Sequence, residues 1–276
     1  MSWKSRLCIY DLGVEESQIL LETKLHIEAP NWSPDGQFLI VNGGGKLYRV
    51  ALEKPELRAI ETGDLTRLNN DHGISPDGQT LAISDHSADN KSAIYELPIA
   101  GGAPKRITKN VPSWWHGWSP DGARHAYTAV REGRFGIWTC PTGGGAERCL
   151  VESDHHYDGP DYTPNGQWVW FNSDRGGAMD LWRVAADGTA LEQMSDDRAI
   201  NWFPHPSPDG AHVLYLAYPE GTFGHPADLE VRLRLMPARG GAARDLVSLF
   251  GGQGTINVPC WAPGSGHFAY VEYARP

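Results

Sequence analysis

A four-residue motif, Ser-Pro-Asp-Gly in its commonest form, recurs along the whole chain and constrains the fold more than any other feature. The motif often follows a tryptophan and always precedes a run of mainly apolar residues. Six copies are present, and their prolines are Pro34, Pro76, Pro120, Pro164, Pro208 and Pro263. The spacings are 42, 44, 44, 44 and 55 residues, which is typical of a repeated unit of four short strands. We therefore expect a ring of similar β-units.

Each copy of the motif predicts a tight turn between two strands. Proline presets φ for the second turn position, Asp or Asn accepts backbone hydrogen bonds, and Gly supplies a positive φ. Alternating residues such as 79–84 then leave the turn as a half-buried strand. A second strand pair with a glycine-rich turn, for example 143–145, follows most copies. One unit is thus strand a, turn, strand b, loop, strand c, turn, strand d.

The two ends of the chain complement each other. The sixth unit stops after strand b, at 270–273, whereas residues 6–12 and 18–23 resemble strands c and d. Residues 1–24 therefore complete the last blade. The prediction is an all-β fold, a single six-bladed β-propeller domain over 1–276 with four-stranded antiparallel blades. Closing the ring in this way hides sheet edges that would otherwise pair with other chains.

Composition excludes several classes of protein. The 276 residues include 24 Lys and Arg against 34 Asp and Glu, a net charge of −10, so no basic surface is predicted for nucleic acid. The longest aliphatic stretches, such as 38–41, have about four residues, too few for membrane insertion. We expect a monomer. The first residues lack an export signal, which predicts a cytoplasmic protein; the alternative is a periplasmic protein whose signal is missing from the given chain.

The cysteines do not form a recognisable framework. Cys8, Cys140, Cys149 and Cys260 contain no CxxC pair, which argues against a zinc site of that type. Free, half-buried thiols are expected. A cross-strand disulfide between Cys140 and Cys149 is left open.

Two further segments accompany the repeat, Gly-His-Pro-Ala-Asp at 224–228 and Phe-Gly-Gly-Gln-Gly-Thr-Ile-Asn-Val-Pro at 250–259. With the Trp-Ser-Pro-Asp-Gly repeat, they make the chain resemble the TolB-like family of WD40-like propeller proteins, in its single-domain form. TolB itself has an additional amino-terminal domain and is periplasmic. The resemblance implies the propeller fold more strongly than an activity. Related repeats also occur in prolyl-oligopeptidase-type enzymes and in oligogalacturonate lyase.

Topology assigns the loops to two faces. The a–b and c–d turns lie on one face, and the b–c and d–a loops lie on the other. The spacing of 55 exceeds the usual 44 by 11 residues, and the excess lies in 218–228 and 249–257. Both segments open on the second face, where long loops on a rigid scaffold commonly bind ligands.

Polar and aromatic residues gather where the d–a loops enter the central channel. The positions six residues before the motif prolines are Glu28, Asn70, Trp114, Asp158, Trp202 and Asn257. The candidate ligand-binding residues are Asp158, Asn201, Trp202, His205, His225, Gln253, Asn257, Trp114 and His116. Trp202 is expected to stack on the ligand, while Asp158 and the amides bond its polar groups. The alternative is that these side chains only fill the narrow channel.

Two functions are consistent with these residues at the mouth of the central channel. The first is a non-enzymatic propeller that binds a peptide, a partner protein or a glycan over the channel. The second is a glycan-active enzyme, a metal-assisted lyase or hydrolase, with His72, His116, His205 and His225 as candidate ligands of a divalent metal. No cofactor is predicted otherwise. The chain lacks the nucleophile-elbow, zinc-protease and phosphate-loop motifs, which favours the binding protein.

Overall fold

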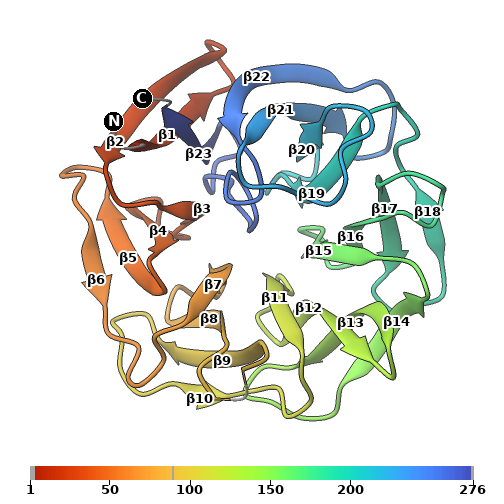
Figure 1. Ribbon diagram of the computed structural model, residues 1–276, viewed down its shortest axis with the longest axis horizontal. Helices are drawn as coiled ribbons and strands as arrows, with labels where there is room; N and C mark the ends of the chain where they lie inside the picture. The colour runs from red at the N-terminus through yellow and green to blue at the C-terminus, as the bar shows by residue number, and fades with distance from the viewer. Residues whose placement is uncertain (1–3, 89, 275–276) are drawn as a thin grey trace.

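The computed structural model describes residues 4–88 and 90–274, and its strands form six antiparallel sheets around a central axis (Figure 1). Five sheets have four strands each. In chain order these strands are β3 (Glu28–Trp32), β4 (Phe38–Gly43), β5 (Lys46–Ala51), β6 (Arg58–Ile60); β7 (Leu68–Ile74), β8 (Thr80–Asp85), β9 (Ala93–Pro98), β10 (Lys105–Arg106); β11 (Ser113–Trp118), β12 (Arg124–Arg131), β13 (Arg134–Pro141), β14 (Arg148–Ser153); β15 (Tyr157–Tyr162), β16 (Trp168–Ser173), β17 (Asp180–Ala185), β18 (Leu191–Gln193); and β19 (Ile200–Pro206), β20 (His212–Tyr218), β21 (Leu229–Pro237), β22 (Arg244–Gly251). The predicted six-bladed all-β propeller is confirmed. Within the described ranges no helix is long and apolar enough to span a membrane.

The sixth blade joins the two ends of the chain, as the repeat predicted. It contains β1 (Lys4–Asp11), β2 (Glu16–Thr23) and β23 (His267–Ala274) in the order β2-β1-β23. Strand β1 pairs antiparallel with β23 over eight positions, from Lys4 opposite Ala274 to Asp11 opposite His267. Figure 1 shows the two chain ends in this one blade. The N-terminal strands therefore close the ring.

The innermost strand of the sixth blade is reduced to one bridge, between Trp261 and Phe268. Backbone carbonyls in this segment bond side chains of other blades instead of a regular ladder. The Ile256 carbonyl lies 2.6 Å from Nε2 of His205, and the Pro259 carbonyl accepts from Nδ2 of Asn31 at 2.7 Å. The segment thus ties the ring together across the channel.

The repeated motif forms the predicted turns through the same hydrogen bonds in each full copy. Ser119 Oγ donates to Asp121 Oδ1 at 2.6 Å and accepts from the Arg124 backbone N–H at 2.9 Å. Gly122 has φ +70°, a conformation that favours glycine. Equivalent Ser-to-Asp bonds of 2.5–2.6 Å occur at Ser33, Ser75 and Ser207. The turn is therefore determined locally, within about five residues.

The apolar core lies between neighbouring sheets. Trp115 and Trp118 of the third sheet along the chain pack with Ala82 and Ile94 of the second. Trp118 Nε1 also donates to the Gly73 carbonyl at 3.2 Å. A Cβ on Gly73 would lie 2.1 Å from the Trp115 ring, so glycine is required for this contact. Packing of this kind holds adjacent blades together and fixes the inner strands around the channel.

All four cysteines are free. Cys140 lies opposite His125, and Cys149 lies opposite Trp138, so the two are not partners in the sheet. Burial raises the pKa of the Cys8 and Cys140 thiols to about 12. The cross-strand disulfide that the sequence left open is absent from this structure.

Candidate functional site

A cavity of about 480 Å³ opens at the mouth of the central channel, on the face of the long loops. Inner strands of several blades and both inserted loops contribute side chains to it. The lining residues are Glu28, Asn69, Asn70, Asp71, His86, Trp114, His116, Thr128, Phe135, His156, Asp158, His225, Gln253 and Asn257. The cavity therefore combines carboxylates, imidazoles, amides and aromatic rings, as polar-ligand sites commonly do.

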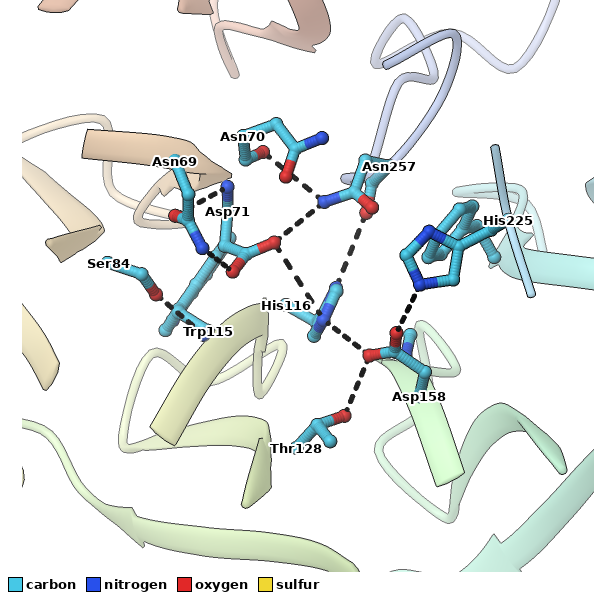
Figure 2. Close-up of polar contacts among 12 residues, drawn as sticks. Asn69, Asn70, Asp71, Ser84, Trp115, His116, Thr128, Asp158, His225 and Asn257 are labelled. Carbon is cyan, nitrogen blue, oxygen red and sulfur yellow. Dashed lines mark hydrogen bonds and ion pairs between the residues drawn. The ribbon is translucent and has the colours of Figure 1, made fainter. Parts of the chain in front are cut away.

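Asp158 and His116 form the centre of the cavity wall (Figure 2). Asp158 Oδ1 lies 3.0 Å from His116 Nε2 and accepts from Thr128 Oγ1 at 3.0 Å and from the Gly159 N–H at 2.9 Å. His116 Nδ1 faces the Asn257 carbonyl at 3.3 Å. Both ring nitrogens of His116 thus face acceptors, which favours the charged imidazolium.

The pKa values of this pair shift in opposite directions. Burial opposes ionisation of Asp158, but the adjacent imidazoles of His116 and His156 outweigh it and hold the pKa of Asp158 well below its usual range. Burial also lowers the pKa of His116, yet the hydrogen bond to Asp158 and the charges of Asp71 and Asp158 raise it overall. Both shifts therefore favour the ionised form of the pair.

Asp71 lies on the other side of His116 and is only 4% exposed. Its carboxylate accepts from Asn257 Nδ2 at 2.7 Å and from Asn69 Nδ2, and it lies 4.0 Å from His116 Nε2. Burial raises the pKa of Asp71 to about 6. Asp71 is thus a buried carboxylate whose close partners are neutral amides.

A row of aromatic and imidazole rings lies beside Asp158, and Trp114, Phe135, His156 and His225 of this row line the cavity. Trp114 stacks on Phe135 with ring centroids 6.5 Å apart and planes 13° apart. Phe135 lies 4.5 Å from His156, and His156 lies 5.6 Å from Trp202. Trp202 in turn contacts the edge of His225 at 4.4 Å. The row connects three blades and gives the cavity a rigid aromatic side.

The two inserted loops, 218–228 and 249–257, are joined by a hydrogen bond at the channel mouth. Tyr218 Oη donates to the Pro226 carbonyl at 2.9 Å, and the Gln253 N–H donates to the same carbonyl at 3.4 Å. Gly252 has φ +154°, and a Cβ there would lie 2.0 Å from the Pro226 carbonyl oxygen. A glycine is therefore needed where the loops cross. This contact presents His225 and Gln253 to the cavity.

The structure brings six of the nine predicted binding residues to the cavity: Trp114, His116, Asp158, His225, Gln253 and Asn257. Asn201, Trp202 and His205 do not line it. Trp202 is 1% exposed and supports His156 and His225 from behind, so the expected stacking on a ligand is not possible here. Asn201 donates to Asp197 Oδ1 at 3.0 Å, away from the cavity. His205 lies deeper, between Asp161 and the Ile256 carbonyl.

Several lining residues, above all Asp71, are not among the binding residues predicted from the sequence. Glu28 and Asn70 occupied two of the six aligned positions and could have been chosen on that signal. Asp71 follows Asn70, and the equivalent positions in other units hold unrelated residues. Asp71 lies within an irregularity in the pairing of β7 with β8, between Leu68 and His72, where the regular alternation of side chains is interrupted.

The four histidines named as candidate metal ligands do not converge. His72 is buried beside the Ile40 carbonyl, 3.5 Å from its Nε2, and His205 is held by Asp161. Only His116 and His225 line the cavity. Among residues 4–88 and 90–274, no group of three or more His, Cys, Asp or Glu side chains is placed to hold a metal ion. The expected metal cluster is therefore not formed by these histidines.

Comparisons with known proteins agree with the fold. Residues 116–236 match the family described as the TolB beta-propeller domain. An uncharacterised protein of Agrobacterium fabrum is 46% identical over 99% of this chain and 93% of its own length. A solved structure from Agrobacterium tumefaciens, provisionally named TolB, superposes with a TM-score of 0.98 at 46% identity and full coverage of both chains. The Tol-Pal system protein TolB of Francisella tularensis is 27% identical over 92% of this chain, which spans 58% of that protein. The chain therefore belongs to the TolB-like β-propeller family.

Proposed function

We propose that this protein is a non-enzymatic binding propeller that holds a peptide segment of a partner protein in the cavity at the channel mouth. One observation carries the proposal: two of the four amide side chains that line the cavity have no hydrogen-bond partner among the described residues. The side chain of Asn70, in a residue only 6% exposed, makes no hydrogen bond to the described residues, and neither does that of Gln253. Neither amide belongs to the buried polar atoms without a partner, so both are accessible from the cavity and can donate to and accept from a bound ligand.

A peptide fits these groups well. A peptide backbone presents N–H and C=O groups in alternation, and an amide side chain can both donate to and accept from it. The aromatic side of the cavity, Trp114 and Phe135, would pack against a side chain of the peptide. The TolB relative is named as a protein of the Tol-Pal system, which supports a role among other proteins. The TolB relatives also support the periplasmic alternative for its compartment.

The test is selection of peptides against a blocked variant. A random 12-residue phage library is panned on the protein, with counter-selection on Gln253→Trp, in which an indole fills the cavity. Enriched peptides are synthesised with acetylated N-termini, and calorimetry measures their binding. We expect binding to the wild type and at least a tenfold loss with Gln253→Trp. Glu53→Gln, an exposed change on the turn face, is the matched control and should bind as the wild type does. Enrichment of no peptide, or equal binding to the blocked variant, would contradict the proposal.

A glycan-active enzyme is the second candidate, because two carboxylates of the cavity have pKa values shifted in opposite directions. Burial raises the pKa of Asp71 to about 6, whereas His116 and His156 hold the pKa of Asp158 low despite burial. Such a pair can supply an acid and a base. A reducing-end assay on an oligosaccharide panel tests this candidate, and product formation that Asp71→Asn abolishes would favour it over the binding protein.

A further inference from the structure

We infer that the bound segment presents a cationic group, the side chain of a lysine or an arginine, to the carboxylates of the cavity. The inference rests on the proposed function and specifies its ligand. It derives from the charges around the cavity, the contacts of Asp71, and the rings and amides beside them.

The charged groups of the cavity are unbalanced. Its lining contains the carboxylates Glu28, Asp71 and Asp158 and neither lysine nor arginine. Among the described residues, the candidate counter-charges are the imidazoles of the lining, His86, His116, His156 and His225, and that of His26 beside Glu28. His116 lies 3.0 Å from Asp158, whereas His156 and His225 lie 4.0 and 3.8 Å from its other oxygen. The imidazoles thus gather around Asp158 and leave the other two carboxylates less compensated.

Asp71 and Glu28 are the carboxylates with weaker compensation. The closest partners of Asp71 are the amides of Asn257 and Asn69, and His116 is 4.0 Å away. Glu28 accepts from Asn42 Nδ2 at 3.0 Å and lies 3.6 Å from His26 Nε2. Removing an ion from water is costly unless another charge is brought close. An ammonium or guanidinium group entering the cavity would supply that charge and make charge-assisted hydrogen bonds.

The remaining walls suit the rest of a basic side chain. Trp114 and Phe135 offer aromatic faces, which attract cations and cover the methylene groups of lysine or arginine. Asn70 and Gln253 have free amides for the adjacent peptide backbone. A loop with Gly254 lies against Glu28, where a Cβ would be 2.6 Å from the Glu28 side chain. The close approach keeps this carboxylate at the edge of the cavity.

The charge of the cavity depends on pH. Burial lowers the pKa of His225, so this imidazole is neutral at neutral pH. Burial raises the pKa of Asp71 to about 6, so its carboxylate is ionised at pH 7.5 and protonated at pH 5. The pKa of His156 is raised because the neighbouring Asp158 carboxylate outweighs burial. Acidification therefore removes negative charge and adds positive charge, and a cationic ligand should bind more weakly at pH 5.

The experiment uses the acetylated peptides from the selection described above. For each one, the basic residue is replaced by its neutral isostere, citrulline for arginine or norleucine for lysine. We expect the neutral peptide to bind at least tenfold more weakly to the wild type at pH 7.5. We expect Asp71→Asn to weaken the basic peptide by at least tenfold and the neutral peptide by less than threefold. Glu53→Gln should change neither. Binding of the basic peptide should weaken at least fivefold between pH 7.5 and pH 5.

The outcomes separate this inference from the proposed function. Enriched peptides without lysine or arginine, or equal binding of citrulline and arginine peptides, would overturn the inference while peptide binding stands. Binding only by peptides with a free N-terminal amine would assign the cation to the terminus and overturn the side-chain assignment. Enrichment of no peptide would contradict the proposed function and this inference together. The isostere comparison uses wild-type protein, so it remains decisive if Asp71→Asn does not fold.

Discussion

The two faces of the ring differ in how regular they are: the turn face repeats one hydrogen bond, whereas the mouth varies from blade to blade. On the turn face, the Ser-to-Asp hydrogen bond measures 2.5–2.6 Å at Ser33, Ser75, Ser119 and Ser207. At the mouth, six aligned positions hold six residues of four kinds: Glu28, Asn70, Trp114, Asp158, Trp202 and Asn257. The repeated face specifies the scaffold, and the variable face carries what distinguishes this chain from other propellers.

The contacts of the two faces also differ in the sequence separation of the residues they join. A turn is completed within five residues, as between Ser119 and Arg124. The mouth is held by contacts such as Asn257 to Asp71, separated by 186 positions. A mutation in a turn should therefore affect one blade, whereas a mutation in the mouth should affect several.

Truncation of Trp202 should have the largest effect on the free energy of unfolding. It tests most directly whether the mouth depends on contacts between blades. Trp202→Ala removes a ring that contacts His156, Phe203 and His225. We expect the free energy of unfolding to fall by about 3–5 kcal/mol, the usual cost of emptying a buried aromatic site. Urea denaturation measures the change, with Trp202→Phe as the milder control. A loss below about 1 kcal/mol would show that the aromatic row does not support the mouth.

Neutralising Asp158 should have the next largest effect. Asp158→Asn weakens charge-assisted bonds to His116, and we expect a loss of about 2 kcal/mol at pH 7. Because the folded-state pKa of Asp158 lies well below its unfolded value, its contribution to stability is present at neutral pH. That contribution is lost as the pH falls through about 4 and below. The stability difference between wild type and variant should therefore shrink in acid. A difference that is constant from pH 7 to pH 3 would contradict this assignment.

A single turn should contribute less to the free energy of unfolding than Trp202 or Asp158 at the mouth. Ser119→Ala removes the bonds to Asp121 and to the Arg124 N–H, and we expect a loss of about 1 kcal/mol. Ser75→Ala should cost the same, because its contacts are equivalent. Urea denaturation of both variants checks the equality, and neither should alter peptide binding. Unequal losses of stability, or altered peptide binding, would show that turns with the same geometry differ in their contribution.

Asn70 should affect stability least. Its side chain makes no hydrogen bond to the described residues, so Asn70→Ala should change the free energy of unfolding by less than about 0.5 kcal/mol. The same variant should bind the selected peptides at least fivefold more weakly. Parallel denaturation and calorimetry measure both quantities. A destabilising variant with unchanged binding would make Asn70 a structural residue and sharpen the boundary between scaffold and site.

Sequence reasoning predicted the ring and most of the mouth for the same reason. Six motif copies give both the number of blades and the alignment of their inner strands, and five of the six aligned residues line the cavity. It failed where the inner strands are irregular. The pairing shifts in each of the inner strands β3, β7, β11, β15 and β19, so regular alternation does not show which side chain of a strand faces the channel. Sequence spacing does not reveal such bulges, and Asp71 and Trp202 were misjudged for that reason.

The closure of the ring has a consequence for how the protein is made. Strand β1 finds its partner β23 only about 260 residues later along the chain. At roughly 5–20 residues per second, the ribosome needs about 13–50 seconds to supply that partner. During this interval Cys8 and Tyr10 lack their partners, because both pack in the finished ring with later residues such as Trp202, Leu233 and Phe268. Strand β1 is thus made long before it reaches its final environment, and Cys8 and Tyr10 remain open to other apolar surfaces until β23 arrives.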